Sequence, residues 1–217
     1  MQGGLSLEDY QARQDLLEAV QGMVASGLVT GTSGNVSLRL DDQRVLITPT
    51  GYPYDKLGPD DLPVIDMEGD QVEGELPPSS ERRTHLAVFQ ARPEAQVVMH
   101  THSVYVSVCA VAGLEIPPII DELVIRVGGG VPLAEYVFPG TWELGEAAIA
   151  ALGERRAVLL RNHGLLVIGR DAREALEIAQ LVERLAQVFV HARLLGNVTE
   201  LTPDVVRREL DMFRGQA

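Results

Sequence analysis

Short apolar segments joined by brief polar turns constrain the fold of this chain more than any other feature of its sequence. VSLRL (36–40) and VLIT (45–48) flank the turn-forming DDQ, and LPVIDMEGDQVEG (62–74) has the pattern of a second hairpin. Further strand-like segments are AQVVMHTH (95–102), AVLL (157–160) and LLVIG (165–169). Because hairpin-length connections join antiparallel strands, the sequence predicts a central sheet that is largely antiparallel.

Apolar residues at helical spacing predict helices between and after these strands. The first covers residues 6–26 with Ser6 as its N-cap, and the last begins at Pro203 with Thr202 as its cap. Other helices are expected at residues 80–91, 103–113, 141–152 and 172–195, with irregular chain at 49–62 and 116–140. No repeat or linker interrupts the pattern, so residues 1–217 are expected to form a single α/β domain.

The charge balance limits the class of partner. The chain has 18 basic and 31 acidic residues, a net charge of −13, so neither nucleic acid nor an anionic membrane surface is expected as a partner. A phosphorylated small molecule remains compatible, because a metal can supply local positive charge. The N-terminus lacks the pattern of a signal peptide, and Cys109 is the only cysteine, which excludes an intrachain disulfide. We therefore expect a cytoplasmic protein.

Three of the five histidines form a candidate metal site. His100 and His102 form an H-x-H at the end of an apolar strand, where residues i and i+2 face the same side and can reach one ion. His163 lies in RNHG, a turn between two predicted strands. Three neutral imidazoles with an open position are a usual catalytic zinc set. An exposed or hydrogen-bonded pair explains H-x-H alone equally well, and the spacing does not show that His163 joins it.

Two further segments have the composition of an anion site. Ser79-Ser80-Glu81 begins a predicted helix, where free backbone N–H groups attract anions, although an ordinary helix cap explains this segment more simply. The small residues of GTSGN (31–35), together with Thr50-Gly51, would allow the backbone to approach a phosphate closely. Each glycine-rich turn is a weak signal on its own.

The other reactive side chains have simpler interpretations. Lys56, the only lysine, lies in a solvated loop, so a Schiff-base mechanism is not expected. His85 lies four residues after Glu81 on the same helix face, as a structural histidine or as a support for the site. His191 and Cys109 lie in predicted apolar helices and are expected in the core or at an interface.

Taken together, five segments resemble the class II aldolase/adducin family in their order along the chain. They cover most of residues 20–185 and are GTSGNVSLR, ITPTGYPYDKL, PSSERRTHLAVFQARPEAQVVMHTHS, PLAEYVFPGTWEL and RNHGLLVIG. The resemblance implies a three-layer α/β/α domain, commonly a homotetramer with active sites between neighbouring chains. It also implies cleavage of a ketose 1-phosphate, such as L-fuculose 1-phosphate, to dihydroxyacetone phosphate and an aldehyde such as lactaldehyde.

The resemblance also assigns roles to residues of this chain. It implies that one divalent cation, usually Zn²⁺, is bound by His100, His102 and His163 in each subunit. It implies that Glu81 is the catalytic acid/base and an additional metal ligand when no substrate is bound. The residues implied for the substrate phosphate are Asn35, Thr50, Gly51, Ser79 and Ser80.

The aldehyde end of the site departs from the family pattern. The aldolases carry a tyrosine, which protonates the leaving alkoxide, near the position where this chain has Asp121 and Glu122, and their C-terminal tyrosine has no counterpart here. An acidic pair can serve as the second acid if its pKa is raised, or can mark a sugar-phosphate 4-epimerase, dehydratase or decarboxylase. The family's epimerases tend to carry aspartate where Glu81 stands. A non-enzymatic, adducin-like scaffold is the remaining alternative, and the histidine trio argues against it.

Overall fold

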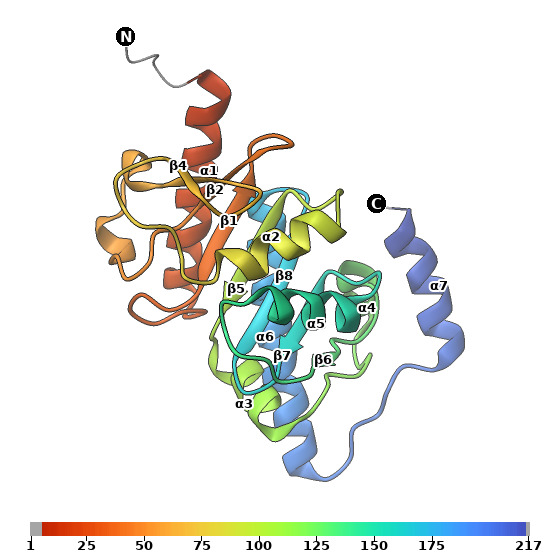
Figure 1. Cartoon of the computed structure of the whole chain (residues 1–217). Helices are drawn as coiled ribbons and strands as arrows, with labels where there is room; N and C mark the ends of the chain where they lie inside the picture. Colours follow the sequence, from red (N-terminus) through yellow and green to blue (C-terminus); the bar gives the residue numbers. More distant parts are fainter. Residues whose placement is uncertain (1–5, 216–217) are drawn as a thin grey trace.

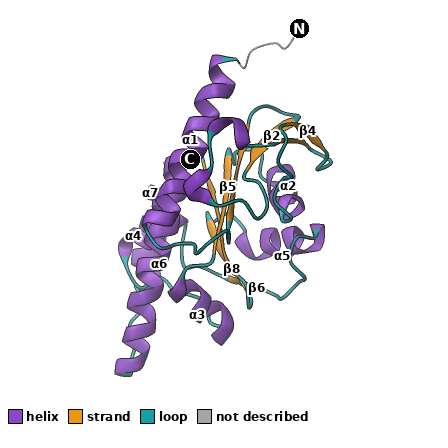
Figure 2. Ribbon diagram, turned by 90° about the vertical axis from the view of Figure 1, so that its left-hand side faces the viewer, coloured by secondary structure: helices purple, strands orange, loops and turns teal. Residues whose placement is uncertain are grey.

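The computed structural model of the chain describes residues 6–215 and shows one sheet between two layers of helices (Figures 1 and 2). The sheet has the order β4-β3-β2-β1-β5-β8-β7-β6, and all of its pairings are antiparallel except that between β6 and β7. The predicted hairpins are confirmed, because β1 pairs with β2 and β3 with β4. The strands are β1 (Asn35–Arg39), β2 (Arg44–Ile47), β3 (Val64–Asp66), β4 (Gln71–Glu73), β5 (Val97–Thr101), β6 (Leu133–Ala134), β7 (Ala157–Leu160) and β8 (Gly164–Gly169).

Helices cover both faces of the sheet. In Figure 2, α2 and α5 lie on one side of the strands and the other labelled helices lie on the opposite side. The helices are α1 (Leu7–Ala25), α2 (Arg82–Ala91), α3 (Val104–Ala112), α4 (Asp121–Val127), α5 (Trp142–Leu152), α6 (Ala172–Leu195) and α7 (Pro203–Arg214), with single 3₁₀ turns at Tyr54–Lys56 and Pro59–Asp61.

Two hydrophobic clusters, one on each face of the sheet, hold these layers together. Along β5 the side chains alternate: Val97 and Met99 pack into the cluster under α1 and α6, and Val98 packs into the cluster under α2 and α5. Every residue of β5 is buried, as expected for a central strand covered on both faces. The sheet is therefore a rigid base for the residues that follow β5.

The sequence prediction was wrong about residues 116–140, which contain α4 and β6 as well as loop. Leu123, Val124 and Val127 of α4 are buried, and Gly128, with a φ of 91°, ends the helix in the left-handed region. A helix of seven residues between glycine- and proline-rich segments is too short to show a helical period.

Helix ends match the expected residues in part. Ser6 caps α1 by accepting a hydrogen bond from the Asp9 amide, as predicted. Thr202 is the N-cap residue of α7, as predicted, but its side chain makes no capping hydrogen bond. Helix α2 begins at Arg82 rather than at Ser80, because the hydroxyl of Ser79 accepts a hydrogen bond from the Glu81 amide and holds the serines in a turn before the helix.

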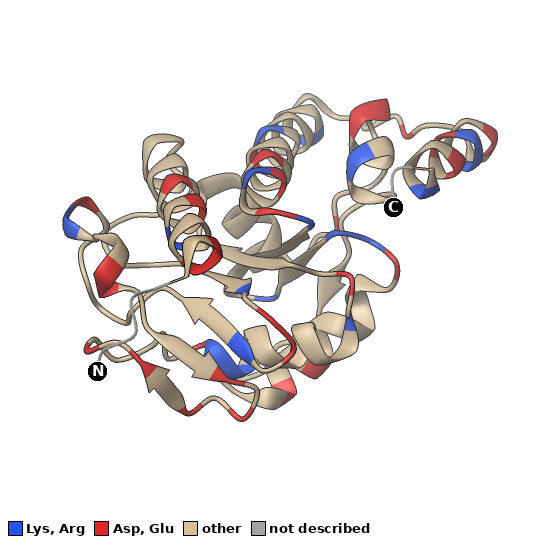
Figure 3. Ribbon diagram, turned by 90° about the horizontal axis from the view of Figure 1, so that it is seen from above, with Lys and Arg blue, Asp and Glu red and all other residues tan. Residues whose placement is uncertain are grey.

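Charged positions are distributed over the helices and loops, and α7 carries both acidic and basic residues (Figure 3). None of the helices within residues 6–215 has the length and apolarity needed to cross a bilayer.

Candidate metal centre and active site

Three histidines converge at the end of β5. His100 is its fourth residue, His102 directly follows the strand, and His163 lies in the tight turn between β7 and β8. His100 Nε2 lies 2.7 Å from His102 Nε2 and 3.2 Å from His163 Nε2. Because β8 pairs with β5, the turn before β8 brings His163 beside the H-x-H, and the three histidines form a group that could hold a metal ion. Their role as metal ligands stays a prediction.

The carboxylate of Glu81 completes this group. Its Oε2 lies 3.2 Å from His100 Nε2, and its Oε1 lies 3.1 Å from His163 Nε2. Glu81 occupies the N-cap position of α2, directly after the Ser79 turn, so the start of this helix places its side chain. Three imidazole nitrogens and a carboxylate are a donor set typical of Zn²⁺.

Hydrogen bonding decides which nitrogen of His100 faces the group. Its Nδ1 donates to the carbonyl oxygen of Leu165 at 2.8 Å, so the neutral ring presents the lone pair of Nε2 to the other histidines and to Glu81. Burial lowers the pKa of His100 to about 3, which keeps the ring neutral at pH 7. Acceptor atoms that face each other at these distances are stable only with a proton or a cation between them, so the residues present fit a divalent cation.

Electrostatic interactions keep Glu81 ionised. Burial on its own would raise the pKa of Glu81, but the electrostatic interaction with His100 and the hydrogen bonds with His163 and Asn35 outweigh burial and hold this pKa well below its usual range. Burial also lowers the pKa of His102. His100 and His102 thus present neutral imidazoles and Glu81 presents an anion, which are the protonation states that a metal ion requires.

Close packing at two glycines supports the histidines. A Cβ atom at Gly164 would lie 2.3 Å from the carbonyl oxygen of Thr101 and 2.9 Å from Cδ2 of His102. Gly34 has a φ of 72°, and a Cβ atom there would lie 2.7 Å from the carbonyl oxygen of His100. Both positions therefore require glycine, so that neighbouring backbone can approach the strand that carries the H-x-H.

The residues implied for phosphate binding lie along the same edge. Asn35 begins β1, pairs in register with His100, and donates from Nδ2 to Glu81 Oε2 at 3.0 Å. Residues 48–50 run beside residues 77–79, with hydrogen bonds from Thr50 N to Pro77 O and from Ser79 N to Thr48 O. This pairing brings Thr50 and Gly51 to the segment that contains Ser79 and Ser80. Their role in binding phosphate stays a prediction.

Asp121 and Glu122 lie elsewhere in this chain. Both are exposed on α4, which packs against α6 and α7. Glu122 forms an ion pair with Arg184, and Asp121 lies close enough to Glu209 to raise the pKa of that carboxyl, after the larger effect of burial. The structure does not bring either residue to the histidines of the same chain, and the role of second acid stays a prediction.

The remaining sequence candidates have clear environments. Lys56 is exposed and Cys109 is fully buried, as expected. His191 is exposed on α6, with its ring centre 5.5 Å from that of Tyr105. His85 is fully buried and hydrogen-bonded, the environment of a structural histidine.

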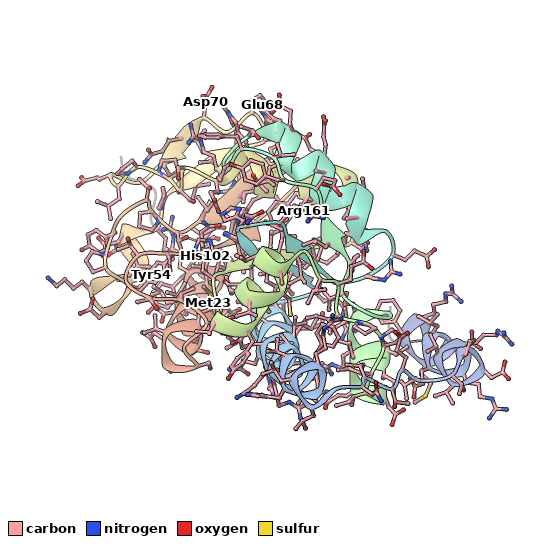
Figure 4. The ribbon with its side chains drawn as sticks, turned by 90° about the horizontal axis from the view of Figure 1, so that it is seen from below. Met23, Tyr54, Glu68, Asp70, His102 and Arg161 are labelled. Carbon is pink, nitrogen blue, oxygen red and sulfur yellow. The ribbon has the colours of Figure 1, made fainter. Side chains whose placement is uncertain are left out.

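Two further residues, which the sequence patterns did not predict, support the site. Glu183 of α6 accepts hydrogen bonds from the Ser103 hydroxyl at 2.7 Å and from the amides of Tyr105 and Val106, at the start of the helix that follows His102. Tyr54 donates to the carbonyl oxygen of Gly34 at 2.6 Å, and burial raises the pKa of Tyr54 to about 12. In Figure 4, His102 lies beside α3. Both contacts join distant parts of the chain, so no local pattern reveals them.

A family model, curated relatives and a solved structure all match this chain, and aldolase is part of the name of each. A model of the Class II Aldolase and Adducin N-terminal domain matches residues 14–190. The chain is 39% identical over 209 residues to the L-fuculose phosphate aldolase of Escherichia coli strain K12, with 96% of each chain covered. It is 35% identical over 202 residues to a 5-methylthioribulose-1-phosphate/5-deoxyribulose-1-phosphate aldolase of Rhodospirillum rubrum, covering 93% of this chain and 90% of that protein. A solved structure of L-fuculose 1-phosphate aldolase matches with a TM-score of 0.89 at 32% identity, covering 94% of this chain and 96% of that one.

Proposed function

Because the chain belongs to the class II aldolase and adducin family, we propose that it cleaves a ketose 1-phosphate to dihydroxyacetone phosphate and an aldehyde. The observation that carries this proposal is the convergence of three histidine nitrogens, two of which, on His100 and His163, also lie against the carboxylate of Glu81. In the reverse aldol reaction the O4 hydroxyl loses its proton, the C3–C4 bond breaks, and its electron pair stays on C3 while C4 becomes the aldehyde. Protonation of C3 then completes dihydroxyacetone phosphate.

The negative charge that develops on the ketose needs an electron sink. The only lysine, Lys56, is exposed in a loop, so an imine is not available for this purpose. We propose one Zn²⁺ per subunit, held by His100, His102 and His163 and, without substrate, by Glu81. When bound, it polarises the ketose carbonyl as a Lewis acid.

The residues of the chain bind the substrate and move the proton. Glu81 is proposed to transfer the proton at C3, for which its carboxylate must come within hydrogen-bond reach of that carbon. The N-terminal turn of α2 and the facing loop would hold the phosphate and orient the reacting carbons. The proposed phosphate ligands are Asn35, Thr50, Gly51, Ser79 and Ser80.

The group that takes the O4 proton during cleavage donates it back as an acid in the condensation direction, and this second acid is proposed to be Asp121 or Glu122. Both lie on the surface of α4 in the single chain. In a homotetramer with active sites between neighbouring chains, such a surface residue can serve the histidines of the next chain. The assembly is therefore part of the proposal.

The first experiment is aldol cleavage of L-fuculose 1-phosphate by zinc-loaded protein, with dihydroxyacetone phosphate measured through a coupled dehydrogenase. We expect product that disappears after EDTA treatment and returns with zinc. The similarity to the Rhodospirillum rubrum aldolase makes 5-deoxyribulose 1-phosphate and 5-methylthioribulose 1-phosphate the second candidate substrates. Absence of dihydroxyacetone phosphate from all three, with metal content verified, would overturn the proposal. Product NMR would then distinguish epimerisation or dehydration, which keep the carbon skeleton, from decarboxylation.

A further inference from the structure

A chain of buried hydrogen bonds lies behind the Glu81 carboxylate. His85, fully buried on α2, lies 2.6 Å through Nδ1 from the hydroxyl of Ser37 and 2.5 Å through Nε2 from Oδ1 of Asn35. Asn35 in turn donates from Nδ2 to Glu81 Oε2 at 3.0 Å. Asn35 and Ser37 are two residues apart on β1 and so face the same side of the sheet. One histidine therefore contacts both side chains.

The direction of each hydrogen bond follows from the chemistry of the two ends. An ionised carboxylate only accepts, so the amide nitrogen of Asn35 must face Glu81 and its oxygen must face His85. An amide oxygen also only accepts, so His85 must donate from Nε2. The Nδ1 atom of the neutral ring then carries a lone pair and accepts from the Ser37 hydroxyl. Burial lowers the pKa of His85 to about 4, in agreement with a neutral ring at pH 7.

We propose that His85 is a positioning residue that holds the Asn35 amide with its N–H groups toward Glu81. Its effect on turnover rests on the proposed aldolase function. The two sides of an asparagine amide are nearly equal in shape, so an unrestrained amide can turn over and bring its oxygen against the carboxylate. The amide oxygen would then repel the carboxylate, and Glu81 would rotate away from it. The hydrogen bond from the Nε2–H group of His85 to Oδ1 of Asn35 prevents the amide from turning over.

The same contact also affects the proposed phosphate site. The Asn35 amide has two N–H groups, and one of them is used by Glu81. The second stays available to the substrate phosphate. His85 therefore orients the proton-transfer group and one of the proposed phosphate ligands together, although it touches neither the substrate nor the metal.

Two substitutions at position 85 separate this role from simple filling of the core. His85→Gln places an amide N–H near the Nε2 position and keeps the donor to Asn35, whereas His85→Asn reaches only the Nδ1 position and loses this donor. We expect kcat to fall at least tenfold in His85→Asn and less than threefold in His85→Gln. Val88→Ala, at a fully buried apolar position of the same helix, is the control for lost stability and should keep the kcat of the folded protein.

A double-mutant cycle tests whether His85 acts through Asn35. In the Asn35→Ala background, His85→Asn should lower kcat by less than twofold, because the amide that it orients is absent. Full additivity of the two losses would overturn the proposal, as would equal kcat values for His85→Gln and His85→Asn.

The histidine tautomer gives a readout that does not depend on activity. In ¹⁵N-histidine-labelled protein, we expect His85 to show the neutral form protonated at Nε2 at pH 7. A ring protonated at Nδ1 would overturn the inference even if the protein is an aldolase. If the protein makes no dihydroxyacetone phosphate but His85 carries its proton on Nε2, the proposed function fails and the orientation of Asn35 stands.

Discussion

His100 donates a hydrogen bond from Nδ1 to the backbone carbonyl of Leu165, 2.8 Å away on the neighbouring strand β8. This contact fixes the ring so that Nε2 faces His102, His163 and Glu81. The hydrogen-bonded sheet therefore orients the central ligand of the candidate metal centre before any metal binds.

The first prediction concerns metal binding. Each chain should retain close to one equivalent of Zn²⁺ after dialysis, and His163→Ala should retain almost none, because one of three converging nitrogens is removed. Metal content is measured by inductively coupled plasma mass spectrometry. His191→Ala is the control, since this exposed histidine lies on α6 outside the trio. Full zinc occupancy in His163→Ala would contradict the assignment of this ligand.

The second prediction separates proton transfer from metal binding. Glu81→Gln should keep its zinc, because the three histidines remain, and should lose roughly 10²–10⁴-fold in kcat, the usual contribution of a general acid or base. Turnover and metal content are measured on the same sample. Turnover close to that of the wild type would remove Glu81 from the reaction.

The third prediction concerns the close contact at Gly164. An added Cβ would lie 2.3 Å from the Thr101 carbonyl oxygen and 2.9 Å from His102 Cδ2, so Gly164→Ala should cost about 1–3 kcal/mol of stability and weaken zinc binding. Urea unfolding and zinc titration measure the two effects. Gly58→Ala is the matched control, because its Cβ would meet only Asp61 Oδ2, at 3.4 Å. The same zinc affinity in both variants would show that this contact does not position His102.

The fourth prediction concerns Glu183, whose carboxylate accepts three hydrogen bonds at the start of α3. Glu183→Gln should lower the free energy of unfolding by about 1–3 kcal/mol, because charge-assisted hydrogen bonds are lost. Glu177→Gln on the same helix should change it by about 0.5 kcal/mol or less, since Glu177 forms exposed ion pairs with Arg126 and Arg173. Equal effects of the two substitutions in urea unfolding would refute the special role of Glu183.

The fifth prediction concerns pH. Burial lowers the pKa of His85 to about 4 in the folded protein from 6.5 in an unperturbed histidine. Between these values only the unfolded chain takes up the proton on His85. Protonation of His85 in the unfolded chain therefore lowers the free energy of unfolding as the pH falls from about 6.5 towards 4, and it has no effect above this range. From pH 7 to pH 5 this contribution is about 2 kcal/mol. Urea unfolding should show a steeper loss for the wild type than for His85→Gln, and equal losses would exclude His85 as the cause.

Local patterns were enough to predict most elements of the fold. The hairpins β1–β2 and β3–β4 follow from short turns between alternating strands, and the predicted bounds of α6 agree with the structure because its apolar residues keep one period over 24 residues. Helix α4 escaped prediction because its seven residues are too few to show a period. Residue spacing likewise predicted that His100 and His102 share one side of a strand end.

What the sequence determined by itself is therefore what depends on residues close together in the chain: the strands, the long helices, the H-x-H pair and the family resemblance. The tertiary structure alone decided which distant groups meet. His163 joins His100 across 63 positions because β8 pairs with β5, and Glu183 reaches Ser103 across 80 positions because α6 packs against α3. Side-chain direction at Asn35 and His85 was decided in the same way, since hydrogen-bond donors and acceptors match only after folding buries them together.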